Sequence, residues 1–294
     1  MPHSGNCMPG EPPVSRTKIA DLVSAIFVRI ISMDQKLRGL LERTLKATTP
    51  LAEMGTENHS TFLNVLLGIY RVSFSTLRDI YYLSQNEESG ASALDLARKI
   101  MEYGISVEYM IWKGKDEKAQ QFQQFMAVEL HRSLEFLKSI GQDVIQQDDE
   151  TLKSGAEDYE KEYVSLKKEV RERKSWAGLS VDQMLKQLHT ADQFKDFDFS
   201  RIGEAYIWGS RLNHVSPVVV RNLMGSEETR VASAFYMRQA ITFALIFHFR
   251  LSTRYIDEMR FLSGQNVHQE LADAVVSLRD EFNALQLEDR VTLK

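Results

Sequence analysis

The sequence is poor in residues that break helices and in residues that form cross-links. It contains one cysteine, Cys7, so it can form neither an internal disulfide nor a zinc site made of several cysteines. Only six of its 294 residues are proline, and four of these lie within residues 1–16. Because proline cannot donate the hydrogen bond that a helix interior requires, the rest of the chain can form long helices.

The sequence also lacks a long hydrophobic run. The most apolar stretch, Ala240–Phe249, lies between Arg238 and Arg250 and has about half of the roughly 20 residues that a membrane span requires. It is therefore expected to form a buried core helix. Residues 1–16 contain no apolar stretch, so they do not resemble a signal peptide and are expected to form a disordered leader. We expect a cytoplasmic protein that does not enter a membrane.

Apolar residues recur at helical spacing through most of the chain, and the helical patterns stop near Pro50 and Pro217. The sequence therefore predicts an all-α fold, a multi-helix bundle of about nine or ten helices. These form a single helical domain over residues 17–290, or two lobes divided near residues 141–150. Ser92 and Ser180 are the expected N-caps of two helices. The expected helices cover residues 17–46, 59–85, 92–112, 116–140, 152–174, 180–189, 200–214, 226–262 and 265–285.

The expected helix over residues 152–174 differs from the others because it is highly charged and resembles a coiled coil. Its apolar residues alternate steps of four and three along the chain, the spacing of a coiled-coil seam. We predict that it packs on a neighbouring helix or contacts another protein or a second copy of the chain. Its basic residues, from Lys167 to Lys174, are interleaved with Glu169 and Glu172 and are expected to face solvent. Nucleic-acid binding there is an alternative, although the net charge of −5 argues against a protein that coats nucleic acid.

Common catalytic and cofactor motifs are absent from the sequence. There is no Gly-rich phosphate loop, no His-Glu-x-x-His and no Gly-x-Ser-x-Gly elbow. None of the seven histidines follows a glutamate at the spacing Glu-x-x-His, which a ferritin-like di-iron site would need. We therefore predict no cofactor and no metal site.

The first candidate site lies on the helix that follows Gly90. Arg98 and Glu102 are four residues apart, so they share one face of this helix. The rest of its surface is mostly apolar, which indicates a central helix, and charges on a central helix need partners. Glu108 raises the same question because its neighbours are apolar. The alternatives are a structural ion pair or a functional site.

The second candidate site lies on the helix that ends before Pro217. Tyr206, Ser210 and His214 are spaced four residues apart and project to one side of this helix. Two hydroxyls and an imidazole could bind a phosphate or share a proton. The alternative is that Tyr206 and His214 are core residues whose polar atoms find backbone partners. His248, inside the apolar run, is expected to be a core histidine.

The two candidate sites resemble the pattern of a prokaryotic family, domain of unknown function 5677. In that family an Arg-x-x-x-Glu helix, here Arg98 to Glu102, leads into a segment similar to residues 117–129. A tryptophan, here Trp176, precedes a Tyr, Ser and His element. The resemblance covers roughly residues 60–225 and implies an all-helical fold. It points to the residues of the two candidate sites without assigning roles to them.

A second helical group, the HEPN ribonucleases, carries an arginine followed by four to six residues and then a histidine. Arg211 precedes His214 with two residues between them, and Arg260 precedes His268 with seven. The chain therefore lacks this ribonuclease signature before each of its histidines.

The sequence leaves two functional hypotheses. The first is a non-catalytic module that binds a partner or a small anionic ligand, with a buried network of Arg98, Glu102, Tyr206, Ser210 and His214. The alternative is an enzyme that processes nucleic acid or nucleotides in a toxin-like or phage-defence system. In that enzyme the catalytic candidates are His214 as the acid or base, Arg98 as the phosphate ligand and Glu102 as the residue that orients one of them.

Overall fold

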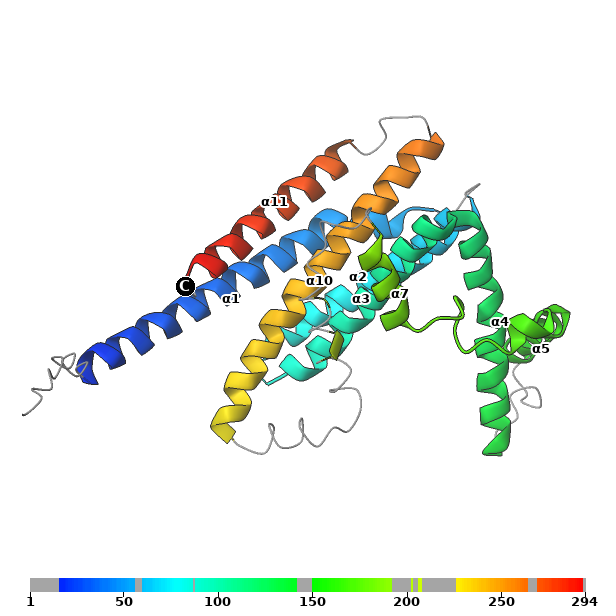
Figure 1. The fold of residues 1–294 in the computed structure, drawn as a ribbon, viewed down its shortest axis with the longest axis horizontal. Helices are drawn as coiled ribbons and strands as arrows, with labels where there is room; N and C mark the ends of the chain where they lie inside the picture. Colours follow the sequence, from blue (N-terminus) through cyan, green and yellow to red (C-terminus); the bar gives the residue numbers. More distant parts are fainter. Residues whose placement is uncertain are drawn as a thin grey trace, which may run out of the picture.

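The computed structural model describes residues 16–55, 60–86, 88–141, 150–191, 202, 206–207, 226–263 and 269–292. Over these residues the fold is all α, with nine helices packed together and no strand (Figure 1), which confirms the predicted fold class. The helices are α1 (Arg16–Glu53), α2 (Thr61–Leu83), α3 (Gly90–Lys113), α4 (Lys115–Ser139), α5 (Glu150–Ser165), α6 (Lys168–Arg171), α7 (Val181–Thr190), α10 (Ser226–Ser263) and α11 (Gln269–Thr292).

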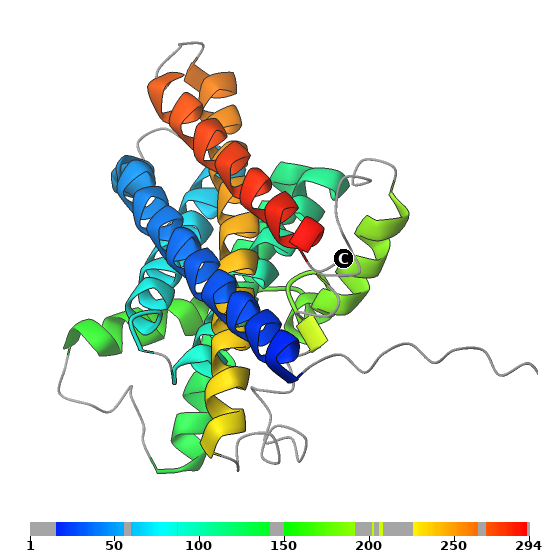
Figure 2. The same cartoon turned by 90° about the vertical axis from the view of Figure 1, so that its left-hand side faces the viewer.

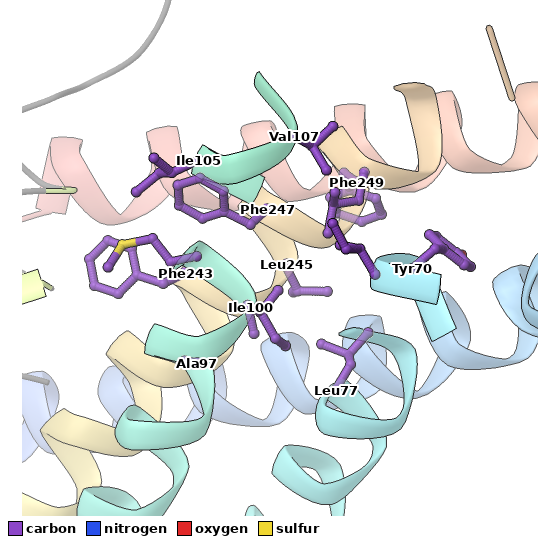
Figure 3. Packing of buried hydrophobic residues seen from close by; sticks show 14 of the residues in the cluster. Tyr70, Leu77, Ala97, Ile100, Ile105, Val107, Phe243, Leu245, Phe247 and Phe249 are labelled. Atoms are coloured by element: carbon purple, nitrogen blue, oxygen red, sulfur yellow. The ribbon is translucent and has the colours of Figure 1, made fainter. Parts of the chain in front are cut away.

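The centre of the bundle is the contact between α3 and α10, and α2 packs against both helices. Aromatic and aliphatic side chains of the three helices interdigitate in this core (Figure 3). The apolar run Ala240–Phe249 forms the middle of α10, and most of its side chains are buried, as the sequence predicted. Each fully buried aliphatic or aromatic side chain contributes about 1.5–3 kcal/mol through removal from water, so this contact is a main source of stability.

Two glycines of α3 allow α10 to approach closely. A Cβ atom built on Gly90 would lie 1.9 Å from the carbonyl oxygen of Ser233, and one on Gly104 would lie 2.4 Å from Cδ1 of Phe247. The Gly90 N–H also donates a 2.9 Å hydrogen bond to the Ser233 hydroxyl. The backbone of α10 therefore contacts α3 where a larger residue would separate the two helices.

We expect Gly90→Ala to destabilise the protein by about 1–3 kcal/mol, because the clash is with backbone atoms that cannot rotate away. The result would run against the intrinsic preference of a helix for alanine. Gly68→Ala, on α2, is the matched control, since no atom lies within 4 Å of its added Cβ. Urea unfolding of both variants tests this prediction. Equal stability of Gly90→Ala and the wild type would show that α10 does not approach α3 so closely.

The N-terminal and C-terminal helices lie side by side along one flank of the bundle (Figures 1 and 2). Arg43 of α1 and Glu281 of α11 form a two-pronged ion pair, with N–O distances of 2.8 Å and 2.5 Å. Both side chains are exposed, so the pair contributes little stability. The pair marks where α11 lies along α1.

The first helix is longer than the sequence predicted, because it continues through Pro50 to Glu53. Two contacts stabilise this last turn beyond the proline. Leu51 is completely buried, and the Arg71 guanidinium donates hydrogen bonds to the carbonyl oxygens of Ala52 and Met54 at 3.0 Å and 2.5 Å. Burial and capping of the free carbonyl groups thus compensate for the hydrogen bond that proline cannot make.

Two other helix ends also differ from the prediction. The third helix begins at Gly90 rather than after Ser92, because the Ser233 hydroxyl of α10 accepts the hydrogen bond of the first free N–H. The charged helix expected over residues 152–174 is divided into α5 and α6, with a break at Leu166–Lys167. Ser180 does precede α7, and its backbone N–H donates to the Gln183 side chain at 2.9 Å.

The helices α4 and α5 form an arm that leaves the bundle (Figure 1). They are joined at His131 of α4, whose Nδ1 lies 2.7 Å from Oε1 of Glu160. The imidazole also stacks on the ring of Tyr163, with centroids 3.7 Å apart. The charged helix therefore packs on its neighbour, one of the two arrangements that its sequence allowed.

Among the helices that the structure describes, none contains an uncharged hydrophobic stretch of the length that a membrane span requires. The expected leader, apart from Arg16 at the start of α1, lies outside the described residues. The expected helix over residues 200–214 is described only at Ile202, Tyr206 and Ile207, which are helical.

Candidate functional site

Arg98 and Glu102 form the ion pair that their spacing predicted. Nε of Arg98 donates to Oε1 of Glu102 at 2.8 Å along the surface of α3. Arg98 is 14% exposed and Glu102 is 30% exposed, so the pair is half-buried rather than sealed in the core. Among the described residues, no acceptor bonds the two terminal nitrogens of the Arg98 guanidinium.

Tyr206 lies over this ion pair. The guanidinium carbon of Arg98 is 4.9 Å from the centroid of the Tyr206 ring, a cation–π contact. Ile202, one helical turn before Tyr206, is buried in the core and anchors this segment. Two of the sequence-predicted elements therefore meet at one place, and we call Arg98, Glu102 and Tyr206 the Arg98 site. Ser210 and His214 lie outside the described residues.

Two further polar side chains lie close to this pair along α3, Asp95 three residues before Arg98 and Tyr103 directly after Glu102. Burial raises the pKa of Tyr103, and the charges of Glu102 and Glu129 raise it further, so the Tyr103 hydroxyl keeps its proton and can donate it in a hydrogen bond. Oδ1 of Asp95 is buried and accepts no hydrogen bond from a described residue.

A second charged group joins α3 to α10 on another side of the helix. Glu108 is 2% exposed and accepts hydrogen bonds from two arginines of α10. Nε of Arg250 lies 2.5 Å from Oε1, and Arg254 donates to both carboxylate oxygens, at 2.9 Å and 3.1 Å. Burial alone would raise the pKa of Glu108, but the hydrogen bonds and positive charges of Arg254 and Arg250 outweigh it and hold the pKa below its usual value.

The two groups have different characters. The Glu108 carboxylate is sealed and its oxygens accept three hydrogen bonds, so it is a structural link between the two central helices. The question that the sequence raised about Glu108 is answered by Arg250 and Arg254, which are four apart and share one face of α10. Arg254 did not enter the sequence-based site. The available signal was a glutamate among apolar neighbours on one helix and an Arg-x-x-x-Arg that begins directly after the apolar run of another.

A third polar group lies in the core between α1, α2 and α10. His248 is completely buried, and its Nε2 is 3.1 Å from Oγ1 of Thr48. The Thr48 hydroxyl already donates to the Thr44 carbonyl oxygen at 2.7 Å, so the proton in the bond with His248 belongs to Nε2. Nδ1 has no hydrogen-bond partner among the described residues. His248 is thus the core histidine that the sequence predicted, satisfied at one of its two nitrogens.

The described residues contain no group of three or more His, Cys, Asp or Glu side chains that could hold a metal ion.

The fold and the Arg98 site define an all-helical protein with a half-buried Arg–Glu pair on its central helix. The chain belongs to the Family of unknown function (DUF5677), whose profile matches residues 63–231. The family resemblance inferred from the sequence is therefore confirmed, and the match includes the residues of both candidate sites. No curated protein and no solved structure matches the chain.

Proposed function

We propose that the protein is a non-catalytic binding module that holds the anionic group of a ligand at the Arg98 site. The observation that carries this proposal is the position of the Arg98 guanidinium between Glu102 and Tyr206. The bond through Nε and the ring contact fix the plane of the guanidinium. A fixed guanidinium binds a carboxylate or a phosphate with two parallel hydrogen bonds and little further loss of entropy.

The role of Glu102 supports binding rather than catalysis. Its carboxylate accepts a 2.8 Å hydrogen bond from Arg98, an arrangement that orients an arginine and does not present a free base. The oriented guanidinium suits a ligand with an anionic oxygen group, and phosphorylated small molecules are the class that we infer.

The proposal predicts that phosphate stabilises the protein through Arg98. Inorganic phosphate, pyrophosphate and adenosine monophosphate, added at millimolar concentration, should raise the melting temperature of the wild type, because a ligand that binds only the folded state stabilises it. Arg98→Gln should weaken binding at least about tenfold, the loss expected for a charge-assisted pair. Arg98→Lys should bind with intermediate affinity, since lysine keeps the charge and loses the planar contact with Tyr206.

Arg78→Gln is the matched control, because Arg78 is an exposed arginine on the neighbouring helix α2. It should retain the affinity of the wild type in isothermal titration calorimetry. If Arg98→Gln and Arg78→Gln bind the three anions with the same affinity, the anions do not bind at Arg98 and the proposed site is wrong. The proposal also states that the protein is not a catalyst. Mass spectrometry of adenosine triphosphate after incubation with the protein tests this statement. Turnover by the wild type that is lost in His214→Ala would establish an enzyme in place of a binding module.

A further inference from the structure

The charge on the outer part of the arm changes sign along the chain. Between residues 153 and 162 there are four acidic and two basic side chains, and between residues 167 and 174 there are five basic and two acidic ones. The change falls at the break between α5 and α6. We call residues 153–174 the α5–α6 strip. It has a negative first half and a positive second half.

Much of this charge faces solvent. Asp158 and Glu162 in the negative half and Lys168 and Lys174 in the positive half are exposed. Val164, between the two halves, is a 68% exposed aliphatic side chain. The strip is described without a gap, and within it no ion pair joins the negative half to the positive half. The two halves therefore do not neutralise each other within one copy of the chain.

The strip is held rigidly on α4. His131 bonds to Glu160 and stacks on Tyr163, which fixes the negative half. Arg132 donates to the carbonyl oxygens of Arg171 and Arg173, at 3.3 Å and 2.5 Å, which fixes the positive half. The two halves therefore keep one relative orientation, and binding to them would cost little ordering of the backbone.

A surface with this pattern is complementary to itself. If a second copy is turned end to end, its positive half faces the negative half of the first copy, and the reverse contact forms at the other end. A parallel arrangement would place like charges opposite each other. The geometry points to a second copy of the chain, bound antiparallel through the α5–α6 strip, with the two Val164 side chains near the two-fold axis.

The association is weak and depends on salt, because exposed ion pairs are strongly screened. We expect the dissociation constant to rise at least about tenfold from about 0.1 M to about 1 M NaCl, over which the screening length falls from about 10 Å to about 3 Å. Sedimentation equilibrium of the full chain at both salt concentrations measures this change.

Two charge-reversed variants of the full chain test the arrangement itself. In the first, Lys167, Lys168 and Lys174 become glutamate, so both halves are negative. In the second, Glu157, Asp158 and Glu162 become lysine, so both halves are positive. Each variant alone should be monomeric, because each half then faces a like charge. An equimolar mixture should form a one-to-one heterodimer with an affinity within about threefold of the wild-type dimer, because opposite charges face each other again at both ends.

Circular dichroism of each variant shows whether it remains folded. Formation of the heterodimer is a second control, because an unfolded variant cannot form it. A wild type that is monomeric at millimolar concentration in low salt would overturn the proposal. So would dimers of both variants alone, or a mixture that stays monomeric. A third outcome is that the variant with the reversed positive half sediments differently from the wild type and the variant with the reversed negative half does not. The strip then binds a separate polyanion such as a nucleic acid, and the proposed self-association is wrong.

Discussion

Glu108→Gln should lower the free energy of unfolding by about 3 kcal/mol, because it leaves two arginines of α10 beside a neutral partner in the core. Glutamine has nearly the volume of glutamate, so the loss reports charge and hydrogen bonding rather than a cavity. The carboxylate accepts all three hydrogen bonds that Arg250 and Arg254 donate to it. Urea unfolding at pH 7 measures the change.

The matched control for Glu108→Gln is Glu102→Gln on the same helix. Glu102 is 30% exposed and pairs with one arginine four residues away, so its replacement should cost under about 1 kcal/mol. The two substitutions make the same chemical change on α3, but Glu108 is buried and pairs with two arginines of α10, whereas Glu102 is partly exposed and pairs with one arginine of its own helix. Similar losses for the two variants would mean that Glu108 is not the buried link between the central helices.

Glu108 also makes stability depend on pH at the acid end. Its pKa is held below the ordinary value in the folded protein by Arg254 and Arg250. The unfolded chain therefore takes up a proton first as the pH falls, and the stabilisation present above the ordinary pKa is lost as the pH falls through the folded value. This loss should be absent in Glu108→Gln, which cannot titrate at this position.

The second large effect is the loss of stability in mild acid caused by His248. Burial lowers the pKa of His248 from 6.5 to about 3, and a proton added at Nδ1 would have no acceptor among the described residues. The unfolded chain binds that proton near pH 6.5 and the folded protein does not. Stability is therefore full above pH 6.5 and should fall by about 1.4 kcal/mol per pH unit below it, or about 2 kcal/mol by pH 5.

The window from pH 7.5 to pH 5 separates His248 from the carboxylates, which titrate below it. Urea midpoints measured across this window should fall for the wild type and stay level for His248→Phe or His248→Gln. Of the two replacements, phenylalanine keeps the ring contacts with Tyr70 and Phe74, while glutamine keeps a donor for Thr48. His189→Gln, on the exposed surface of α7, should retain the slope of the wild type. If the urea midpoint of the wild type does not change between pH 7.5 and pH 5, His248 takes up its proton in the folded core as easily as in the unfolded chain, and the prediction is wrong.

The helices could be predicted because their apolar spacing is a local property of the chain. The seam of residues 152–174 shows the limit of that argument, since its spacing continues through Lys167 while the backbone breaks there. The continuation of α1 through Pro50 could not be predicted either. It depends on Arg71, which is 19 residues further along the chain than the carbonyl of Ala52 that it binds.

In the candidate site, too, contacts between residues near in sequence could be predicted and contacts between distant residues could not. The Arg98–Glu102 pair is a contact between residues four apart, and the sequence predicted it. The pairing of Glu108 with Arg254 joins residues 146 positions apart, and apolar neighbours indicated only that some partner was needed. The first functional hypothesis placed Arg98 and Tyr206 in one network, and the structure brings these two residues to 4.9 Å, while Ser210 and His214 lie outside the described residues.

The close contact of α3 with α10 also shows that the family match and the packed core end at different residues. The family profile ends at residue 231, which is within the first turns of α10. The residues of α10 that meet Gly104 and Glu108 of α3, namely Phe247, Arg250 and Arg254, lie beyond it. A fragment cut at the limits of sequence similarity would expose the apolar surface of α3 to water. The helix that packs on α3 thus lies mostly outside the region that the family profile matches, so a fragment that keeps this core must extend beyond residue 231.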